Sequence, residues 1–252
     1  MRAICPKCNS SHVSKKGVVY SKGYECNVQR YKCVTCNKQF QVPRDSPKVD
    51  LPKILLFDIE TAPMEVYVWG LYKQFIPHTN IIKDSKGEEK SWYVLSWAAK
   101  WLYDENVVSD IVTPEETKTR DDKRVLQSIW KLLDEADIVI GHNGDRFDLR
   151  KLNARFIDND IKPPSPFRTI DTLKVARREF AFVSYKQDYL TKHFKLEQKL
   201  STNFQLWVDC IHGVQEQLDT MEEYNRHDVM GLEEVYLKLR PYIKNHPNLG
   251  VL

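Results

Sequence analysis

The 252-residue chain has no run of 18 consecutive apolar residues. A helix that crosses a membrane needs about 20 such residues, so no transmembrane segment is predicted. No secretory leader is recognisable either, and the six cysteines are few for the length. We therefore expect a protein of a reducing compartment, the cytoplasm, whose cysteines are not paired in disulfides.

Internal repeats and low-complexity tracts are missing as well, and the length suits one larger domain plus one small module. Charge is unevenly divided: residues 1–46 carry nine Lys or Arg against two Asp or Glu, whereas the remainder carries 29 against 33. We predict a small basic module at residues 1–46, a proline-rich linker (Gln41–Pro52) that ends at about residue 52, and a larger domain at residues 51–252.

Four of the cysteines form two C-x2-C pairs, Cys5 with Cys8 and Cys33 with Cys36, with 24 residues between the pairs. Two thiolates on a tight turn can bind one tetrahedral Zn²⁺, and a second turn completes the four ligands. A module of this size buries too little to fold well alone, so the Zn²⁺ is expected to be structural. The segment resembles the small zinc ribbons of some transposase and transcription-related proteins.

Aromatic residues are interleaved with the positive charge of this module, at Tyr20, Tyr24, Tyr31 and Phe40. Basic side chains can contact a phosphate backbone, and aromatic rings can stack on bases. Nucleic acid is therefore the favoured partner of the module. Many zinc ribbons bind protein instead, and that alternative stays open.

The larger domain contains three short acidic clusters: FDIET at Phe57–Thr61, HNGDRFD at His142–Asp148 and YNRHD at Tyr224–Asp228. The first ends a nearly continuous apolar run that is typical of a strand buried on both faces. Side chains alternate along a strand, so Asp58 and Glu60 are expected on the same side of the sheet. Two carboxylates this close repel each other unless a cation lies between them.

The other two clusters are expected at helices. Tyr224 and Asp228 lie four residues apart in a helical pattern that ends at Pro241, and they share one helical face. Asp148 falls in the first turn of a predicted helix, and Asp145, the competing residue, is interpreted as a loop or capping residue. Four carboxylates and a tyrosine suffice to hold two divalent cations around a scissile phosphate, which predicts a metal-dependent nuclease.

These residues carry a family resemblance. Three motifs resemble the three exonuclease motifs of the DEDD superfamily. They are FDIET, the N-x3-F-D of Asn143, Phe147 and Asp148, and the Y-x3-D of Tyr224 and Asp228. The match is to the tyrosine branch of this superfamily, found in the proofreading domains of family B DNA polymerases and their stand-alone relatives, and it covers about residues 51 to 242. The histidine branch would place histidine where this chain has Glu223, and His227 does not fit that position.

The resemblance implies an α/β fold of the RNase H-like type, a mixed sheet flanked by helices, preceded here by the zinc ribbon. The hydrophobic pattern is compatible with this fold. Strands are predicted at Leu51–Ile59, Ser91–Ala99, Val107–Val112 and Ile138–Ile140, and helices at Lys123–Leu133, Asp148–Phe156, Ile170–Arg178 and Tyr185–His193.

By the same resemblance, Asp58, Glu60 and Asp228 would hold one Mg²⁺ or Mn²⁺, and Asp58 with Asp148 a second, since oxygen ligands suit these ions. Tyr224 would orient the attacking water, because a phenol with a pKa near 10 is a weak base unaided. The substrate-binding residues implied are Thr61, Asn143 and Phe147, at the terminal nucleotides.

The activity implied is a two-metal-ion 3′→5′ exonuclease that acts on DNA, at single-stranded ends, in replication or repair. Nothing in the motifs recognises a 2′-hydroxyl, so an RNA or sugar-nonselective exonuclease is the alternative. A transposase-like or non-catalytic nucleic-acid-binding factor is the alternative of another class. No polymerase-sized region accompanies the motifs, and a separate polymerase or replication factor is a possible protein partner.

A weaker signal follows the second acidic cluster. Basic residues that could follow a phosphate backbone occur at Lys174, Arg177, Arg178, Lys186, Lys192, Lys195 and Lys199. A solvated helical face is an equally good interpretation. Asp171 in this region is predicted to cap a helix.

Overall fold

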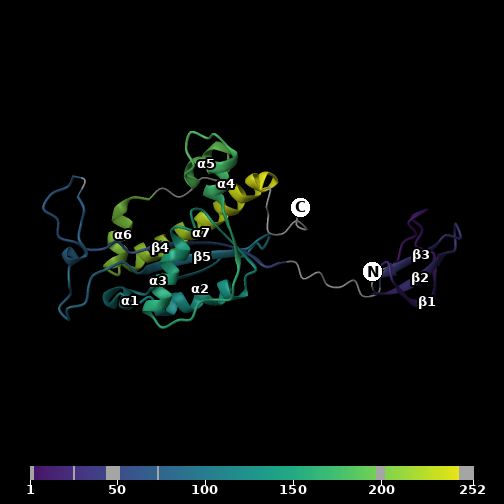
Figure 1. Cartoon of the computed structure of the whole chain (residues 1–252), viewed down its shortest axis with the longest axis horizontal. Helices are drawn as coiled ribbons and strands as arrows, with labels where there is room; N and C mark the ends of the chain where they lie inside the picture. The colour runs from purple at the N-terminus through teal and green to yellow at the C-terminus, as the bar shows by residue number, and fades with distance from the viewer. Residues whose placement is uncertain (1–2, 25, 44–51, 73, 197–201, 244–252) are drawn as a thin grey trace. The chain divides into compact units, whose positions relative to one another are not determined.

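The computed structural model describes residues 3–24, 26–43, 52–72, 74–196 and 202–243. The chain divides into two compact units, Met1–Leu51 and Pro52–Leu252 (Figure 1). Within the described ranges, no helix is long and apolar enough to cross a membrane. The predicted linker lies outside the described residues from residue 44 to 51, and its first three residues, 41–43, belong instead to a strand.

The N-terminal unit is a three-stranded antiparallel sheet of β1 (Val13–Ser21), β2 (Cys26–Cys33) and β3 (Gln39–Pro43). The pairing of β1 with β2 shifts register around Gly17, whose φ of 94° is open to glycine and unfavourable for other residues. Strands β1 and β2 form an antiparallel hairpin between the two cysteine pairs, and β3 adds a third strand.

The core of this unit is very small. Tyr31 of β2 stacks on Phe40 of β3 with ring centroids 5.5 Å apart. Among the described residues of the unit, the buried apolar side chains are those of Cys5, Val28 and Cys33. Burial on this scale contributes little to folding, so the unit needs another source of stability.

The larger unit is built on a five-stranded mixed sheet with the strand order β6-β5-β4-β7-β8. Three strands form an antiparallel meander, β4 (Ile54–Thr61), β5 (Val94–Trp101) and β6 (Val108–Ile111). The strands β7 (Ile138–Gly141) and β8 (Arg168–Asp171) run parallel to β4. Because β4 has a partner on each side and helices over both faces, its sequence is almost continuously apolar.

Helices cover both faces of the sheet: α1 (Pro114–Thr119), α2 (Lys123–Glu135), α3 (Asp148–Asp158), α4 (Thr172–Glu179), α5 (Gln187–His193), α6 (Phe204–Ile211) and α7 (Gln215–Leu239). Single 3₁₀ turns occur at His78–Asn80 and Arg240–Tyr242. In Figure 1, α2 and α3 lie on one side of the sheet, and α4, α5 and α7 lie on the other.

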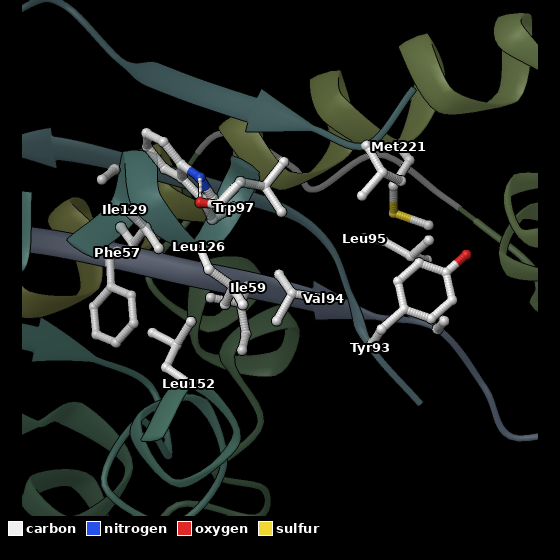
Figure 2. Packing of buried hydrophobic residues seen from close by; sticks show 14 of the residues in the cluster. Phe57, Ile59, Tyr93, Val94, Leu95, Trp97, Leu126, Ile129, Leu152 and Met221 are labelled. Atoms are coloured by element: carbon white, nitrogen blue, oxygen red, sulfur yellow. Dashed lines mark hydrogen bonds between the residues drawn. The ribbon is translucent and has the colours of Figure 1, made fainter. Parts of the chain in front are cut away.

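Two apolar clusters follow from this layering. Phe57 and Ile59 of β4 pack with Leu126 and Ile129 of α2 and Leu152 of α3 (Figure 2). The neighbouring β4 residues Ile54 and Leu56 point the other way and pack with side chains of α4, α5 and α7. The alternation of side chains along β4 therefore divides the core in two. Asp58 and Glu60 lie on the same face of the strand as Leu56, the face that α7 covers.

The mixed sheet flanked by helices is the predicted architecture, and four elements of the larger unit depart from the prediction. The helix expected at Ile170–Arg178 begins only at Thr172, since Ile170 and Asp171 end strand β8. Strand β8 has only four residues, and the first two are exposed. It therefore shows neither a continuous apolar run nor an alternation of apolar and polar residues from which a strand could be predicted. Two short helices, α1 and α6, were also not predicted.

Candidate active site

Strand β4 carries two acidic side chains on the face that α7 covers. Asp58 pairs with Ala98 of β5 and Glu60 pairs with Ser96. Immediately after Glu60 the register shifts, so the regular ladder ends at the second carboxylate. The strand thus presents two half-buried acids, two residues apart, at its carboxyl end.

Helix α7 brings a third carboxylate to them. One oxygen from each of Asp58, Glu60 and Asp228 lies within 4.8 Å of the others, although Asp228 is about 170 residues further along the chain. Two oxygen ligands of one Mg²⁺, each about 2.1 Å from the ion, are roughly 3 to 4 Å apart. The three carboxylates therefore fit a hard divalent cation with little movement, and the cation would relieve their mutual repulsion.

Asn225, a residue that the sequence did not single out, fixes the orientation of Asp58. It is fully buried on α7, and its Nδ2 donates to Asp58 Oδ2 at 2.8 Å. The Ser96 hydroxyl donates to Asn225 Oδ1 at 3.2 Å, which determines which end of the amide faces the carboxylate. Buried amides that hold a metal-binding carboxylate in this way commonly affect metal affinity.

We expect Asn225→Leu, which keeps the branched shape in a somewhat larger side chain and removes the donor, to weaken Mn²⁺ binding about tenfold to a hundredfold. Isothermal titration of the metal measures this directly. The matched control is Asn153→Leu on the exposed surface of α3, which should bind Mn²⁺ as the wild type does. Equal affinities for the two variants would show that Asn225 does not position the metal-binding carboxylate.

Trp207 of α6 contacts two members of the site. Its Nε1 donates to Glu60 Oε2 at 3.2 Å, and its ring packs edge-on against Tyr224 with centroids 5.8 Å apart. Tyr224 is itself nearly buried beside Asp228, one helical turn away. Trp207 was not predicted as a site residue, because α6 is a short helix that the hydrophobic pattern did not reveal.

Asp148 reaches β4 from the other side. It is the first residue of α3, it is almost fully buried, and its Oδ1 accepts the main-chain N–H of Ile59 at 3.1 Å. Burial raises the pKa of this carboxyl to about 7, although the Ile59 N–H acts in the opposite direction. Asp148 is not one of the three clustered carboxylates. Asp145 lies instead in the loop before α3 and pairs with Lys174 at 2.6 Å.

Asp171 caps α4, since its side chain accepts the main-chain N–H groups of Leu173 and Lys174, and this prediction is confirmed. His227 Nε2 lies 3.1 Å from Glu223 Oε1, and neither residue belongs to the carboxylate cluster.

A cavity of about 540 Å³ opens beside Glu60. Thr61, Phe147, Trp207, Trp92 and Lys151 contribute to its wall. Lys151 lies over the Trp92 ring, with its ammonium 3.9 Å from the ring centroid, and burial lowers its pKa.

The residues predicted to bind substrate do not all lie together. Thr61 and Phe147 line the cavity beside Glu60, whereas Asn143 lines a separate cavity with His142. The chain turns sharply between Asn143 and Phe147, and Asn143 itself has a left-handed φ of 66°. The three residues that the resemblance implies for substrate binding therefore lie at two different cavities.

In the N-terminal unit, the Sγ atoms of Cys5, Cys8, Cys33 and Cys36 lie within 4.8 Å of one another, with two pairs at 3.6 Å. A tetrahedral zinc with Zn–S bonds of about 2.3 Å places its sulfurs roughly 3.8 Å apart. The four thiols therefore fit one Zn²⁺. The cluster does not include Cys26 or Cys210.

The two cysteine turns are built alike. Asn9 follows Cys8 with φ of 52°, and Asn37 follows Cys36 with φ of 55°. Asparagine tolerates this left-handed conformation better than most residues, and it turns the chain so that both thiols of a pair point inward.

A family model described as the RNase_H superfamily matches residues 86–240, more than half of the chain. The chain belongs to the RNase H superfamily. The matched segment contains Asp148, Tyr224 and Asp228, whereas Asp58 and Glu60 precede it. The family match therefore does not include Asp58 and Glu60, and it is the fold that brings them close to the matched residue Asp228.

A solved structure with the same fold is that of the family B DNA polymerase from the hyperthermophilic archaeon Pyrobaculum calidifontis. The TM-score is 0.54 and the sequence identity 17%, over 76% of this chain and 25% of the polymerase. The present chain thus spans about a quarter of the length of that protein. No curated protein matches the sequence. Together these findings confirm the RNase H-like fold predicted for the larger unit.

Proposed function

We propose that this protein is a metal-dependent nuclease that removes nucleotides from the 3′ ends of DNA strands. The observation that carries the proposal is the convergence of Asp58, Glu60 and Asp228, from a strand and a distant helix, in a member of the RNase H superfamily. Few roles other than metal binding favour three half-buried or buried carboxylates within 4.8 Å. The direction and the choice of DNA rest on the resemblance to proofreading exonucleases.

Asp58, Glu60 and Asp228 would hold one Mg²⁺ or Mn²⁺, and Asp58 with Asp148 a second. Such ions, when bound, neutralise charge on the phosphate and lower the pKa of a coordinated water. The chain's own contribution is positional. Asn225 holds one oxygen of Asp58, and the Ile59 N–H holds one oxygen of Asp148, so the carboxylates keep their orientation when substrate arrives.

Tyr224 would orient the attacking water through its hydroxyl. Trp207 packs against the ring and also holds Glu60, which keeps the phenol beside the carboxylates. Thr61 and Phe147 line the adjoining cavity of about 540 Å³, which is large enough for a terminal nucleotide. Phe147 as a whole residue is 40% exposed, so it is available for stacking on a base.

Tyr224→Phe keeps the packing against Trp207 and removes the hydroxyl. We expect kcat to fall by about tenfold to a thousandfold, within or below the range for general acid–base groups. The comparison variant is His227→Ala, which removes a side chain paired with Glu223 and should cost far less. An inactive His227→Ala together with a fully active Tyr224→Phe would place this enzyme in the histidine branch.

The reaction itself is tested with 5′-labelled single- and double-stranded DNA and RNA, each incubated with Mg²⁺, Mn²⁺ or EDTA. A metal-dependent ladder that shortens from the 3′ end, stronger on single-stranded DNA, is the expected result. A ladder on RNA alone would replace the DNA proposal with the RNA one. A single internal cut, or no cut in any lane, would favour the transposase-like or non-catalytic alternative.

We propose further that the N-terminal unit binds one structural Zn²⁺ through its four clustered cysteines and contacts nucleic acid. Tyr20 and Tyr24 are mostly exposed and are available for stacking. The charge of residues 1–46, nine basic against two acidic side chains, favours a phosphate backbone. A polymerase or another replication factor is the alternative partner of this unit.

A further inference from the structure

Six of the seven basic residues that follow the second acidic cluster are described by the structure, and they differ in their partners. Three of them are neutralised by carboxylates: Lys174 by Asp145, Arg178 by Glu179 and Lys192 by Asp188, at distances of 2.6 to 3.1 Å. These three behave as ordinary solvated helix residues. Lys195 is exposed and lines neither of the two cavities described above, and Lys199 lies outside the described residues.

Arg177 and Lys186 differ from that group. Within the described parts of the chain neither forms an ion pair, and both are exposed. They line the same cavity of about 570 Å³, Arg177 from α4 and Lys186 from the residue that precedes α5. The described residues that line this cavity include Arg177 and Lys186 and neither Asp nor Glu, so the lining itself carries positive charge.

The cavity wall is held in place before any ligand arrives. His142 Nε2 donates to the main-chain oxygen of Tyr185 at 2.9 Å, since a carbonyl can only accept. The Tyr185 hydroxyl donates to the Phe180 carbonyl at 3.0 Å, and the Arg177 guanidinium lies 5.9 Å from the Tyr185 ring centroid. Asn143 is fixed by its N–H, which donates to Asp171 Oδ1 at 3.0 Å. A rigid site loses less entropy when it binds.

This cavity is also linked to the candidate active site. Gln187, which lines it, donates through Nε2 to the main-chain oxygen of Asp228 at 2.8 Å. The strands β4, β7 and β8 are parallel, so their carboxyl ends share one edge of the sheet. The carboxylates lie at the end of β4, and the cavity lies at the end of β7, where ligands of α/β sheets characteristically bind.

We propose that this cavity binds one backbone phosphate of the substrate strand, at a position other than the phosphate that is cleaved. The guanidinium of Arg177 can hold two phosphate oxygens, and Lys186 adds a point charge. The site is a second contact with the same strand, and it rests on the proposed nuclease function. It accounts for the separation of Asn143 from Thr61 and Phe147, because each cavity holds a different part of the strand.

The test compares the double variant Arg177→Ala/Lys186→Ala with the wild-type full-length protein. Binding of a 5′-fluorescent 15-nucleotide single strand is measured by anisotropy without added Mg²⁺ or Mn²⁺, so that no cleavage occurs and the proposed Zn²⁺ is retained. We expect affinity to fall about tenfold to a hundredfold, as for loss of charge-assisted contacts. The slope of log K against log salt should flatten by about 0.7, the value for one phosphate on a single strand.

The matched controls are Lys174→Ala and Lys192→Ala, which each remove one positive charge that is already paired. Both should bind the 15-mer within about twofold of wild type, since exposed ion pairs contribute little. Arg177→Lys should recover part of the affinity, because the charge returns without the second donor. Melting curves for all variants establish that none is unfolded, and the single variants replace the double one if it is.

Several outcomes would overturn the site. Equal loss of affinity in the double variant and in the paired-lysine controls would mean that only net charge matters. Unchanged 15-mer binding with lost binding of inorganic phosphate, measured by calorimetry, would assign the cavity to a free phosphate. Unchanged binding of both the 15-mer and inorganic phosphate would show that the cavity is not an anion-binding site.

The site and the proposed function can fail separately. If the double variant binds the 15-mer more weakly but the wild type cleaves no substrate, the proposed nuclease function is rejected and the proposed phosphate site is supported. Cleavage by the wild type, with 15-mer affinity unaffected in the double variant, would reject the site and keep the nuclease.

Discussion

Asp228→Asn is expected to lower the cleavage rate by on the order of a thousandfold or more. The substitution keeps the shape of the side chain and removes one of three clustered charges. A metal ion supplies several kcal/mol of stabilisation to the transition state, and each 1.36 kcal/mol is a factor of ten in rate. Asp58→Asn should have a similar effect. Rates are measured by single-turnover cleavage of a labelled single strand at saturating Mg²⁺.

The same variant should melt at an equal or higher temperature than wild type in EDTA. Without a cation, Asp228 is a buried carboxylate close to two others, and removal of its charge relieves their repulsion. Added Mg²⁺ should stabilise the wild type and have little effect on the variant. Lost activity without lost stability would therefore separate a metal-binding role from a folding role.

The second acidic cluster provides the internal control. Asp148→Ala should be severely impaired, since Asp148 reaches β4, whereas Asp145→Ala should retain most activity because its carboxylate pairs with Lys174. The reverse order of activities would assign the metal-binding role to Asp145.

The second large effect is expected at the zinc site. Cys33→Ser removes one of four thiols and should release the single Zn²⁺ and unfold residues 3–43. Structural zinc contributes about 10 to 16 kcal/mol in small zinc modules, which exceeds what the few buried side chains of this unit can supply. Metal content by plasma mass spectrometry and protection from limited proteolysis measure the two effects. The control is Cys26→Ser, because Cys26 lies outside the cluster.

Cleavage of a dinucleotide should survive Cys33→Ser, since the larger unit has its own sheet and cores. Binding of long strands should weaken, and the salt dependence should flatten by about 0.7 for each lost phosphate contact on a single strand. Unaltered binding and salt dependence of an unfolded N-terminal unit would favour a protein partner for it.

The elements that could be predicted are those whose buried positions produce a regular pattern of apolar residues in the sequence. Strand β4 is buried on both faces and is therefore almost continuously apolar, and the long helix α7 shows one apolar face over many turns. Asp58 and Glu60 followed from the two-residue alternation of a strand, and the Asp171 cap followed from ordinary helix chemistry. Each of these signals is local to its segment.

The features that escaped prediction depend on contacts between distant segments. Asn225 is polar and lies in a helix, where such a residue is commonly solvated, and only the packing of α7 on β4 buries it against Asp58. Trp207 was missed because its contacts with Glu60 and Tyr224 come from a short helix with no long pattern. The ion pair between Lys174 and Asp145 likewise cannot be predicted from a single sequence. It distinguishes Lys174 from Arg177, which forms no ion pair within the described residues.

The hydrogen bond between Asn225 and Asp58 spans 167 residues of sequence, and this separation has a consequence for biosynthesis. At about 5 to 20 residues per second, the ribosome adds the intervening residues in roughly 10 to 30 s. During that time β4 has emerged without the helix that covers one of its faces and completes the carboxylate cluster. A nascent chain therefore carries no assembled metal site, and the apolar row of Ile54 and Leu56 is a surface on which chaperones can act until α7 docks.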